Sequence, residues 1–470
     1  MAEAYEGREM GSVVRTAKVY EAAIKKDWEA LKKYCEEDNA IMNFPIMTGA
    51  RSTVLHIAVY SKKVSLVRYL LHLAPSALCE LVNERGDTVL HEAAGVGNVE
   101  MAKELIGSDK ELLKSTNKRG ETPLFRAAAF NQTEMVKFLA SAAVDKTTHR
   151  TRTDGTSILH ITVLSKFFDT ALELLQWDVT LPNIKDKKGM TCFQLVANMP
   201  SAFKSGNPMN ILEELLYLCL PDDDNNDDEK HVTSCQEDLE GGCGRSRPCQ
   251  YFSYSNGRTG LPPIKRLWDI KKQQNRVLRL ARILHVADDT WMGTTPGWGK
   301  PEKKDERSQA APSFEPPIIS AARNGIIEIV DLILAEYPLA TEVVNDREEN
   351  IFHVAARCRR KEILDRLEGL PPQLLRIGRK INIDGDSILH QAAYQDKHQL
   401  RDRPGEALHM QSEIQWFKRL HWAAVPIYTI ACWPVTIFLV LQFGLYLNIA
   451  WFTVSDLMRS FLRSFIDSGH

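Results

Sequence analysis

The feature that most constrains this chain is a short pattern that recurs in two groups along the sequence. A turn that usually carries a glycine precedes a Leu-His pair, or an equivalent pair, which opens a short run of apolar residues at helical spacing. The copies lie 34 or 35 residues apart in the first group and 37 apart in the second, at Leu55-His56, Leu90-His91, Leu124-Phe125, Leu159-His160, Phe193-Gln194, Phe352-His353 and Leu389-His390. Each copy encodes two helices that are too short to bury their apolar faces alone. The pattern therefore predicts a solenoid, in which every copy stacks on its neighbours.

The clearest copy, residues 86–119, shows the plan of one unit. A turn ending at Gly86 leads into a first helical run with Leu90, Ala93 and Ala94 on one face. A break at 97–98 (Gly-Asn) separates it from a second amphipathic run over 101–106. Glycine suits these turns because they need positive φ, which glycine adopts without strain.

The residues of the motif resemble those of a known family. Residues 53–58 (TVLHIA), 88–93 (TVLHEA) and 122–127 (TPLFRA) follow the pattern T-x-L-H-x-A, and this pattern at a period near 33 is typical of ankyrin repeats. The chain is identified as an ankyrin-repeat protein by this resemblance. The expected fold class is all-α, an ankyrin-repeat α-solenoid in two arrays, with one C-terminal transmembrane helix.

Several motif residues have expected structural roles. The threonine can cap the first helix, since its side-chain oxygen can accept a hydrogen bond from a free N–H. The resemblance implies that the histidine hydrogen-bonds this threonine and a neighbouring turn, so we expect structural histidines rather than ligands or bases. The predicted motif residues are Thr53, His56, Thr88, His91, Thr122, His160, His353 and His390. Phe125 and Gln194 depart from the pattern, and we expect their units to be weaker links.

Composition shifts divide the chain into segments. A flexible N-terminus (1–16) precedes array 1 (17–220), which has a degenerate capping unit and about five repeats. An acidic, disordered linker (221–313) follows and contains a basic helix at 264–286. The remaining segments are array 2 (314–403), a juxtamembrane segment (404–421), a transmembrane segment (422–452) and a tail (453–470).

The linker holds two features with competing interpretations. Its cysteines (Cys235, Cys243, Cys249) and His231 allow a zinc site in principle, but they lack a CxxC pair, so we predict no metal ligands. The helix at 264–286 is strongly basic and has an interrupted apolar stripe. It could bind calmodulin or an anionic lipid surface, or it could pack on the end of the second array, which we favour.

The C-terminal tail predicts a membrane segment. No charged residue lies between Arg419 and Asp456, and the 21 residues of 427–447 (IYTIACWPVTIFLVLQFGLYL) are about long enough to span a bilayer once. Lys418 and Arg419 immediately precede the run, which favours arrays that face the cytoplasm. The expected location is the plasma membrane or an endomembrane.

Two blocks resemble a narrower family, the plant ankyrin-repeat membrane proteins. These blocks are Pro316–Pro338 (PPIISAARNGIIEIVDLILAEYP) and Ala407–Lys418 (ALHMQSEIQWFK). In that family several spans with a Pro-Gly-Gly motif follow, whereas this chain has no Pro-Gly-Gly, so that domain is truncated or replaced here. The resemblance implies a role in stress or defence signalling.

Catalytic and nucleic-acid signatures are absent from the sequence. It contains no GxxxxGK[ST], HExxH, GxSxG or CxxC motif, and 59 basic against 61 acidic residues give no overall field for nucleic acid. We therefore predict no enzyme activity and no cofactor. Other proteins are the expected partners, and the turn tips are their expected contact points: Arg85, Asp87, Arg119, Glu121, Arg152, Asp154 and Lys188.

The favoured function is a non-catalytic protein–protein interaction scaffold tethered to a membrane. One alternative is a soluble cytosolic ankyrin scaffold whose tail is an artefact of the gene model. Another is a channel-like or transporter-like membrane protein regulated by its ankyrin domain, although a single uncharged span would have to oligomerise to line a pore.

Overall fold

The structure, a computed structural model, describes residues 16–43, 45–46, 51–73, 81–220, 262–288, 315–371, 376–393 and 406–420. Within these ranges it is helical, with isolated β-bridges at three turns. The all-α class is therefore confirmed for this part of the chain. The acidic run, the linker cysteines, the predicted span at 422–452 and the tail lie outside the described residues. The chain divides into two compact units, Met1–Leu195 and Val196–His470.

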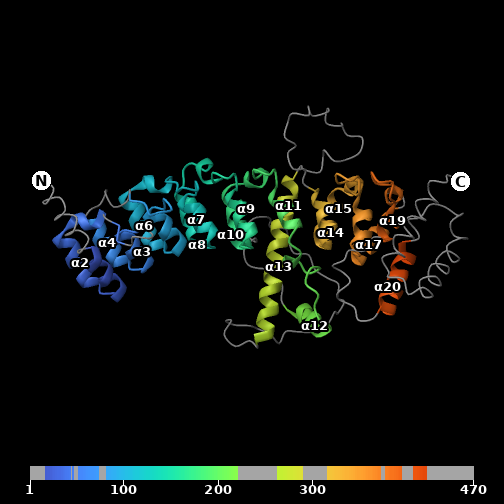
Figure 1. The fold of residues 1–470 in the computed structure, drawn as a ribbon, viewed down its shortest axis with the longest axis horizontal. Helices are drawn as coiled ribbons and strands as arrows, with labels where there is room; N and C mark the ends of the chain where they lie inside the picture. The colour runs from blue at the N-terminus through green and yellow to red at the C-terminus, as the bar shows by residue number, and fades with distance from the viewer. Residues whose placement is uncertain are drawn as a thin grey trace, which may run out of the picture. The chain divides into compact units, whose positions relative to one another are not determined.

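The first unit is a row of helix pairs that follow the predicted repeats. After a helix over residues 16–25, the elements are α2 (Trp28–Glu37), α3 (Val54–Tyr60), α4 (Val64–Leu73), α5 (Val89–Val96), α6 (Val99–Ser108), α7 (Pro123–Ala129), α8 (Thr133–Ala142), α9 (Ile158–Leu164) and α10 (Phe168–Trp177). The first helices α3, α5, α7 and α9 contact one another in order, as do the second helices α4, α6, α8 and α10 (Figure 1). This stacking is the solenoid plan that the repeat period predicted.

Burial in α5 and α6 shows why the repeats stack so closely. Leu90, Ala93 and Ala94 are fully buried in the first helix, and Met101 and Leu105 are fully buried in the second. The alanines have no bulk beyond Cβ, so neighbouring helices can approach closely while the longer side chains fill the space between layers. Neither helix could bury these residues within its own repeat.

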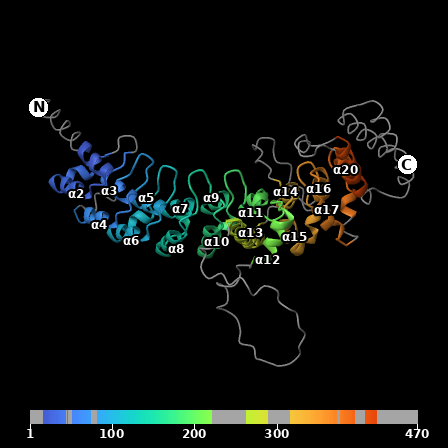
Figure 2. The same ribbon diagram turned by 90° about the horizontal axis from the view of Figure 1, so that it is seen from below.

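Glycine at the turns is required by the spacing of the repeats. Gly86 and Gly120 have φ of +79° and +75°. A Cβ at Gly120 would lie 2.9 Å from the backbone nitrogen of Thr153 in the next turn, and a Cβ at Gly86 would lie 2.9 Å from that of Lys118. Successive turns therefore stack backbone on backbone (Figure 2).

The second unit contains the second array and the helices before it. Helix α11 (Cys192–Ala197) crosses the boundary between the units, and the further elements are η5 (Pro200–Ala202), α12 (Ile211–Cys219), α13 (Pro262–Ala287), α14 (Pro317–Asn324), α15 (Ile327–Glu336), α16 (Ile351–Arg357), α17 (Lys361–Glu368), α19 (Ile388–Ala393) and α20 (Glu406–Arg419). First helices α14, α16 and α19 stack in order, and α15 packs on α17.

Residues that were assigned to array 1 by sequence contact the first helix pair of array 2 directly. Asn324 Nδ2 donates to the carbonyl oxygen of Ala197 at 3.0 Å, and the backbone nitrogen of Ser205 donates to Glu328 Oε1 at 2.9 Å. The backbone nitrogen of Ile327 donates in turn to Ser205 Oγ at 3.3 Å. Residues 197–205 and the helix pair α14–α15 therefore pack together within the second unit.

The basic helix is α13, close to the predicted bounds of 264–286. Its apolar residues Leu267, Val277, Leu280, Ala281 and Leu284 are buried, and the helix contacts α12, η5 and α15. The basic helix thus packs against other helices of the second unit, as the favoured interpretation of the sequence expected. These contacts cover the apolar stripe that calmodulin or a bilayer would need.

Helix α20, placed by sequence in the juxtamembrane segment, docks on the end of array 2. Trp416 Nε1 donates to the carbonyl oxygen of Ala356 at 3.2 Å, and the Arg359 guanidinium lies 5.7 Å from the Trp416 ring centre. Arg359 Nε also donates to Glu413 Oε1 at 3.3 Å. These contacts fix α20 against the end of the second array.

Candidate functional site

Five of the described repeat turns are each fixed by one Asn or Asp side chain, whereas the turn at 152–155 has Arg152 at this position. Asn117 Oδ1 accepts from the backbone nitrogens of Arg119 at 2.9 Å and Glu121 at 3.0 Å. The same pair of bonds forms in the other turns around Asn83, Asp186, Asn345 and Asn382. These residues were missed in the sequence reasoning, although the spacing Asn/Asp-x-x-Gly is visible in four of the five turns.

Three motif histidines of the first unit each join one turn to the next. In the second repeat, His91 Nε2 lies 2.8 Å from the carbonyl oxygen of Glu121, and its Nδ1 lies 2.9 Å from Thr88 Oγ1. Since a carbonyl oxygen only accepts, Nε2 carries the proton, and Nδ1 accepts from the threonine hydroxyl. His56 and His160 make the equivalent bonds, to the carbonyl oxygens of Asp87 and Met190.

Burial keeps these imidazoles neutral. It lowers the pKa of His56, His91 and His160, in each case against a smaller raising effect from the backbone hydrogen bond. Burial also raises the pKa of the Cys192 thiol, which lies 3.4 Å from His160 Nδ1. A neutral donor and a protonated thiol in the core stabilise structure and offer no activated nucleophile.

The two departures from the motif are compensated by other side chains. Where Phe125 replaces the histidine, His149 reaches back from η3 (Thr147–His149) and places Nδ1 3.0 Å from Thr122 Oγ1. Two units further along the chain, Gln194 Oε1 accepts from the Thr191 backbone nitrogen at 3.0 Å. Both units therefore retain a cap, and their expected weakness stays a prediction.

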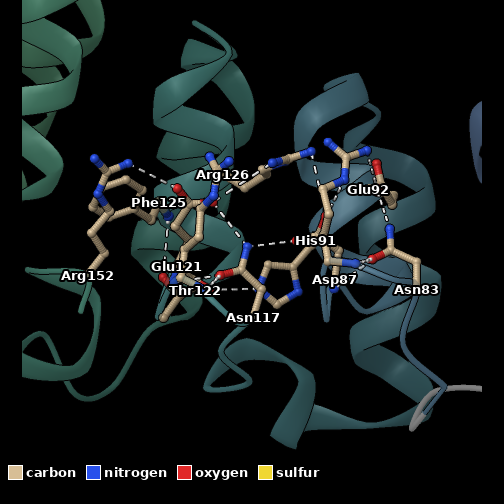
Figure 3. Close-up of polar contacts among 12 residues, drawn as sticks. Asn83, Asp87, His91, Glu92, Asn117, Glu121, Thr122, Phe125, Arg126 and Arg152 are labelled. Carbon is tan, nitrogen blue, oxygen red and sulfur yellow. Dashed lines mark hydrogen bonds and ion pairs between the residues drawn. The ribbon is translucent and has the colours of Figure 1, made fainter. Parts of the chain in front are cut away.

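A chain of alternating charges with a buried centre crosses three turns of the first unit. Arg126, on α7, lies 3.7 Å from Asp87 Oδ2 and 3.8 Å from Glu121 Oε2. Asn117 Nδ2 donates to both carboxylates, at 2.7 and 3.0 Å. Arg85, 3.6 Å from Asp87, and Arg152, 3.3 Å from Glu121, extend the chain at its two ends. We call this set, with Asp154 paired to Arg152, the polar ladder. Figure 3 shows its central members Asp87, Asn117, Glu121, Arg126 and Arg152.

Several effects act on Asp87 at the centre of the polar ladder. Its burial raises the pKa of the carboxyl. The hydrogen bond from Asn117 and the positive charge of Arg126 lower it by more, so the pKa lies below its ordinary value. The carboxylate is therefore charged and held in place, which fixes the turn geometry of two adjacent repeats together.

The polar ladder corrects part of the predicted contact set. Asp87 and Glu121 were predicted as exposed partner-binding tips, but they are 0% and 4% exposed and face inward toward Arg126. Of the other predicted tips, Arg85, Arg119, Asp154 and Lys188 are exposed and Arg152 is partly covered. Asp87 and Glu121 thus serve the turns internally, whereas the exposed members are basic apart from Asp154.

Two apolar side chains lie exposed at the ends of the first helices. Phe130 follows α7 and Leu164 ends α9, and each is 50% exposed. The Arg126 guanidinium lies 4.7 Å from the Phe130 ring centre, so the polar ladder also supports this aromatic side chain. We call Phe130 and Leu164 the apolar anchors.

The described residues offer neither a metal site nor a membrane-spanning helix. In the described ranges, no group of His, Cys, Asp and Glu is arranged to hold a metal ion, and the linker residues considered for zinc lie outside those ranges. None of the helices in the described ranges is both long and apolar enough to cross a bilayer.

Comparison with known proteins identifies the repeats. The family model described as ankyrin repeats (3 copies) matches residues 20–114, 55–150 and 98–186. No curated protein matches the chain. Residues 20–186 are therefore ankyrin repeats, and such repeats indicate a scaffold for binding other proteins.

Proposed function

We propose, on the premise that residues 20–186 are ankyrin repeats, that this protein is a non-catalytic interaction scaffold tethered to a membrane. The polar ladder carries the first part of the proposal, because it holds adjacent turns in one geometry before any partner arrives. A surface that is ordered in advance loses less conformational entropy on binding. The resemblance to plant ankyrin-repeat membrane proteins supports a role in stress or defence signalling.

The apolar anchors supply the contact area that such a surface needs. Interfaces draw most of their affinity from a few aromatic or large apolar side chains surrounded by polar groups. Phe130 meets this description, since it rests on Arg126 and is half exposed. We expect Phe130→Ala combined with Leu164→Ala to weaken partner binding by roughly tenfold or more.

Quantitative proximity labelling with the full-length chain would measure this loss. The matched control is Val144→Ala with Val179→Ala, since these side chains are 95% and 78% exposed but lie in loops after the second helices. The expected result is that proteins enriched by the wild type are lost from the anchor variant and kept by the control. Equal enrichment by the anchor variant and the wild type would contradict this surface.

The tether is proposed to be residues 422–452, with the arrays facing the cytoplasm. Its support is the sequence itself, which has no charged residue between Arg419 and Asp456. We expect the full chain to stay in the membrane pellet after carbonate extraction, whereas a variant that ends at Arg419 should be released. Protease added outside sealed microsomes should digest the arrays.

A charged variant distinguishes a transmembrane helix from a tail that only adheres to the membrane surface or aggregates. Leu439→Lys with Leu441→Lys keeps the tail length but costs about 3 kcal/mol per lysine near the bilayer centre. The variant is expected in the supernatant, and its Leu439→Val, Leu441→Val counterpart in the pellet. Release of the wild-type chain would remove the tether and leave the scaffold proposal intact.

A further inference from the structure

The polar ladder has a consequence for the charge of the turns in the first unit. It takes Asp87 and Glu121 out of solvent, and Asp154 pairs with Arg152. The exposed cations remain at the tips of the turns around residues 85, 118–119 and 187–188. We call these side chains the tip ridge: Arg85, Lys118, Arg119, Lys187 and Lys188.

Two turns of the tip ridge each present a pair of cations. Within the described residues, no acidic side chain forms an ion pair with Lys118, Arg119, Lys187 or Lys188. The turn between them carries Arg152 and Asp154, whose charges neutralise each other at 2.6 Å. The tip ridge therefore has two positive clusters separated by one neutral turn.

Hydrogen bonds between neighbouring turns hold these clusters at a fixed spacing. The Lys118 backbone nitrogen donates to the carbonyl oxygen of Arg85 at 3.1 Å. The Thr153 backbone nitrogen and hydroxyl both donate to that of Arg119, at 2.9 and 2.8 Å. Lys187 stacks in the same way, since a Cβ on Gly155 would lie 3.2 Å from its backbone nitrogen. The charges are therefore carried on a backbone that is already ordered.

We propose that the tip ridge binds an acidic, extended segment of a partner protein. Packed helices lie about 8–10 Å apart, so clusters two repeats apart are separated by roughly 20 Å. An extended peptide advances about 3.3 Å per residue and covers this distance in about six residues. The partner segment therefore carries two acidic clusters about six residues apart. This inference rests on the proposed scaffold function and names the chemistry of the partner.

Binding of synthetic peptides to the full-length chain tests the spacing. The probe is a fluorescent peptide with two Glu-Glu pairs that begin six residues apart in a Gly/Ser background, and its comparison has the four glutamates in one run. Fluorescence anisotropy at low salt should show about tenfold tighter binding of the spaced peptide, lost as the salt concentration rises. Equal binding of both peptides, or no binding, would overturn the proposal.

Charge reversal tests the location. Lys118→Glu with Arg119→Glu, and separately Lys187→Glu with Lys188→Glu, should each weaken the spaced peptide by about tenfold. The neutral pair Lys118→Gln with Arg119→Gln should give an intermediate loss and is less disruptive to folding. The control is Lys62→Glu with Lys63→Glu, an equally charged change at exposed residues between α3 and α4. A loss as large in the control would refute a specific site.

The chain has its own acidic run at 221–230 (PDDDNNDDEK), which is a competing occupant. If replacing its acidic residues by asparagine and glutamine strengthens peptide binding tenfold, the occupant is this run, and an external partner segment is ruled out. Unchanged affinity supports the external segment. Failure of peptide binding with normal partner enrichment would refute the acidic segment alone and leave the scaffold function standing.

Discussion

Replacement of Arg126 by methionine is expected to lower the free energy of unfolding of the first unit by about 3–5 kcal/mol. Arg126 is 7% exposed and is shared by Asp87 and Glu121, which are themselves buried. Methionine keeps much of the volume but leaves two carboxylates in the interior with fewer counter-charges. Urea denaturation followed by circular dichroism would measure the loss.

Two further variants show that charge, rather than volume, causes the loss from Arg126→Met. Lys137→Met removes a half-exposed partner of Glu134 and Glu173 and should cost less than about 1 kcal/mol. Adding Asp87→Asn and Glu121→Gln to Arg126→Met should recover part of the stability, since no buried carboxylate then lacks a cation. A loss from Lys137→Met as large as that from Arg126→Met would contradict this explanation.

Acidification from pH 6.5 to pH 4 is expected to destabilise the second array through His353. Burial lowers the pKa of His353 to about 4, although the charges of Glu349 and Asp386 act in the opposite direction. In the unfolded chain the imidazole takes up a proton near its ordinary pKa of 6.5, whereas the folded chain keeps it neutral. The unfolded state therefore binds more protons in this window, and up to about 3 kcal/mol is lost on going down to pH 4.

A glutamine variant isolates the contribution of His353. Gln194 already accepts the cap hydrogen bond at the equivalent position of another repeat, so His353→Gln should keep the cap without a titrating group. The expected result is a flatter dependence of the unfolding free energy on pH between 6.5 and 4. His72→Gln, at an exposed position, is the control and should keep the wild-type slope. An identical slope in His353→Gln and wild type would show that His353 does not contribute.

Much of this fold could be predicted from the sequence because the same pattern of apolar and turn residues recurs in several repeats. The spacing of Leu90, Ala93 and Ala94 identifies the buried face of a first helix, and the same spacing returns in the other copies. The basic helix was placed at 264–286 and is found at Pro262–Ala287. Local periodicity and turn residues suffice for such elements, since each is encoded within its own stretch of chain.

The candidate site was harder to predict because it depends on contacts between repeats. Asp87 and Glu121 look like exposed turn residues until Arg126, on a different helix, is placed between them. Likewise, nothing near Thr122 indicates that His149 would take the place of the missing motif histidine. To predict such pairings one must know which side chains of neighbouring repeats lie opposite each other. The spacing of the repeats along the sequence does not give this information.

The hydrogen bonds of Asn324 and Ser205 hold together the two ends of the intervening stretch, so the length of the chain between them can vary. Its two ends are anchored at neighbouring points, so extra residues inserted between α12 and α13 cost mainly loop-closure entropy, about 0.6 kcal/mol for each doubling of the loop length. Related genes could therefore differ in length between α12 and α13, whereas loss of α13 would expose the apolar residues that it buries against η5 and α15. Differences in chain length among relatives are therefore expected between α12 and α13, and not within the helices themselves.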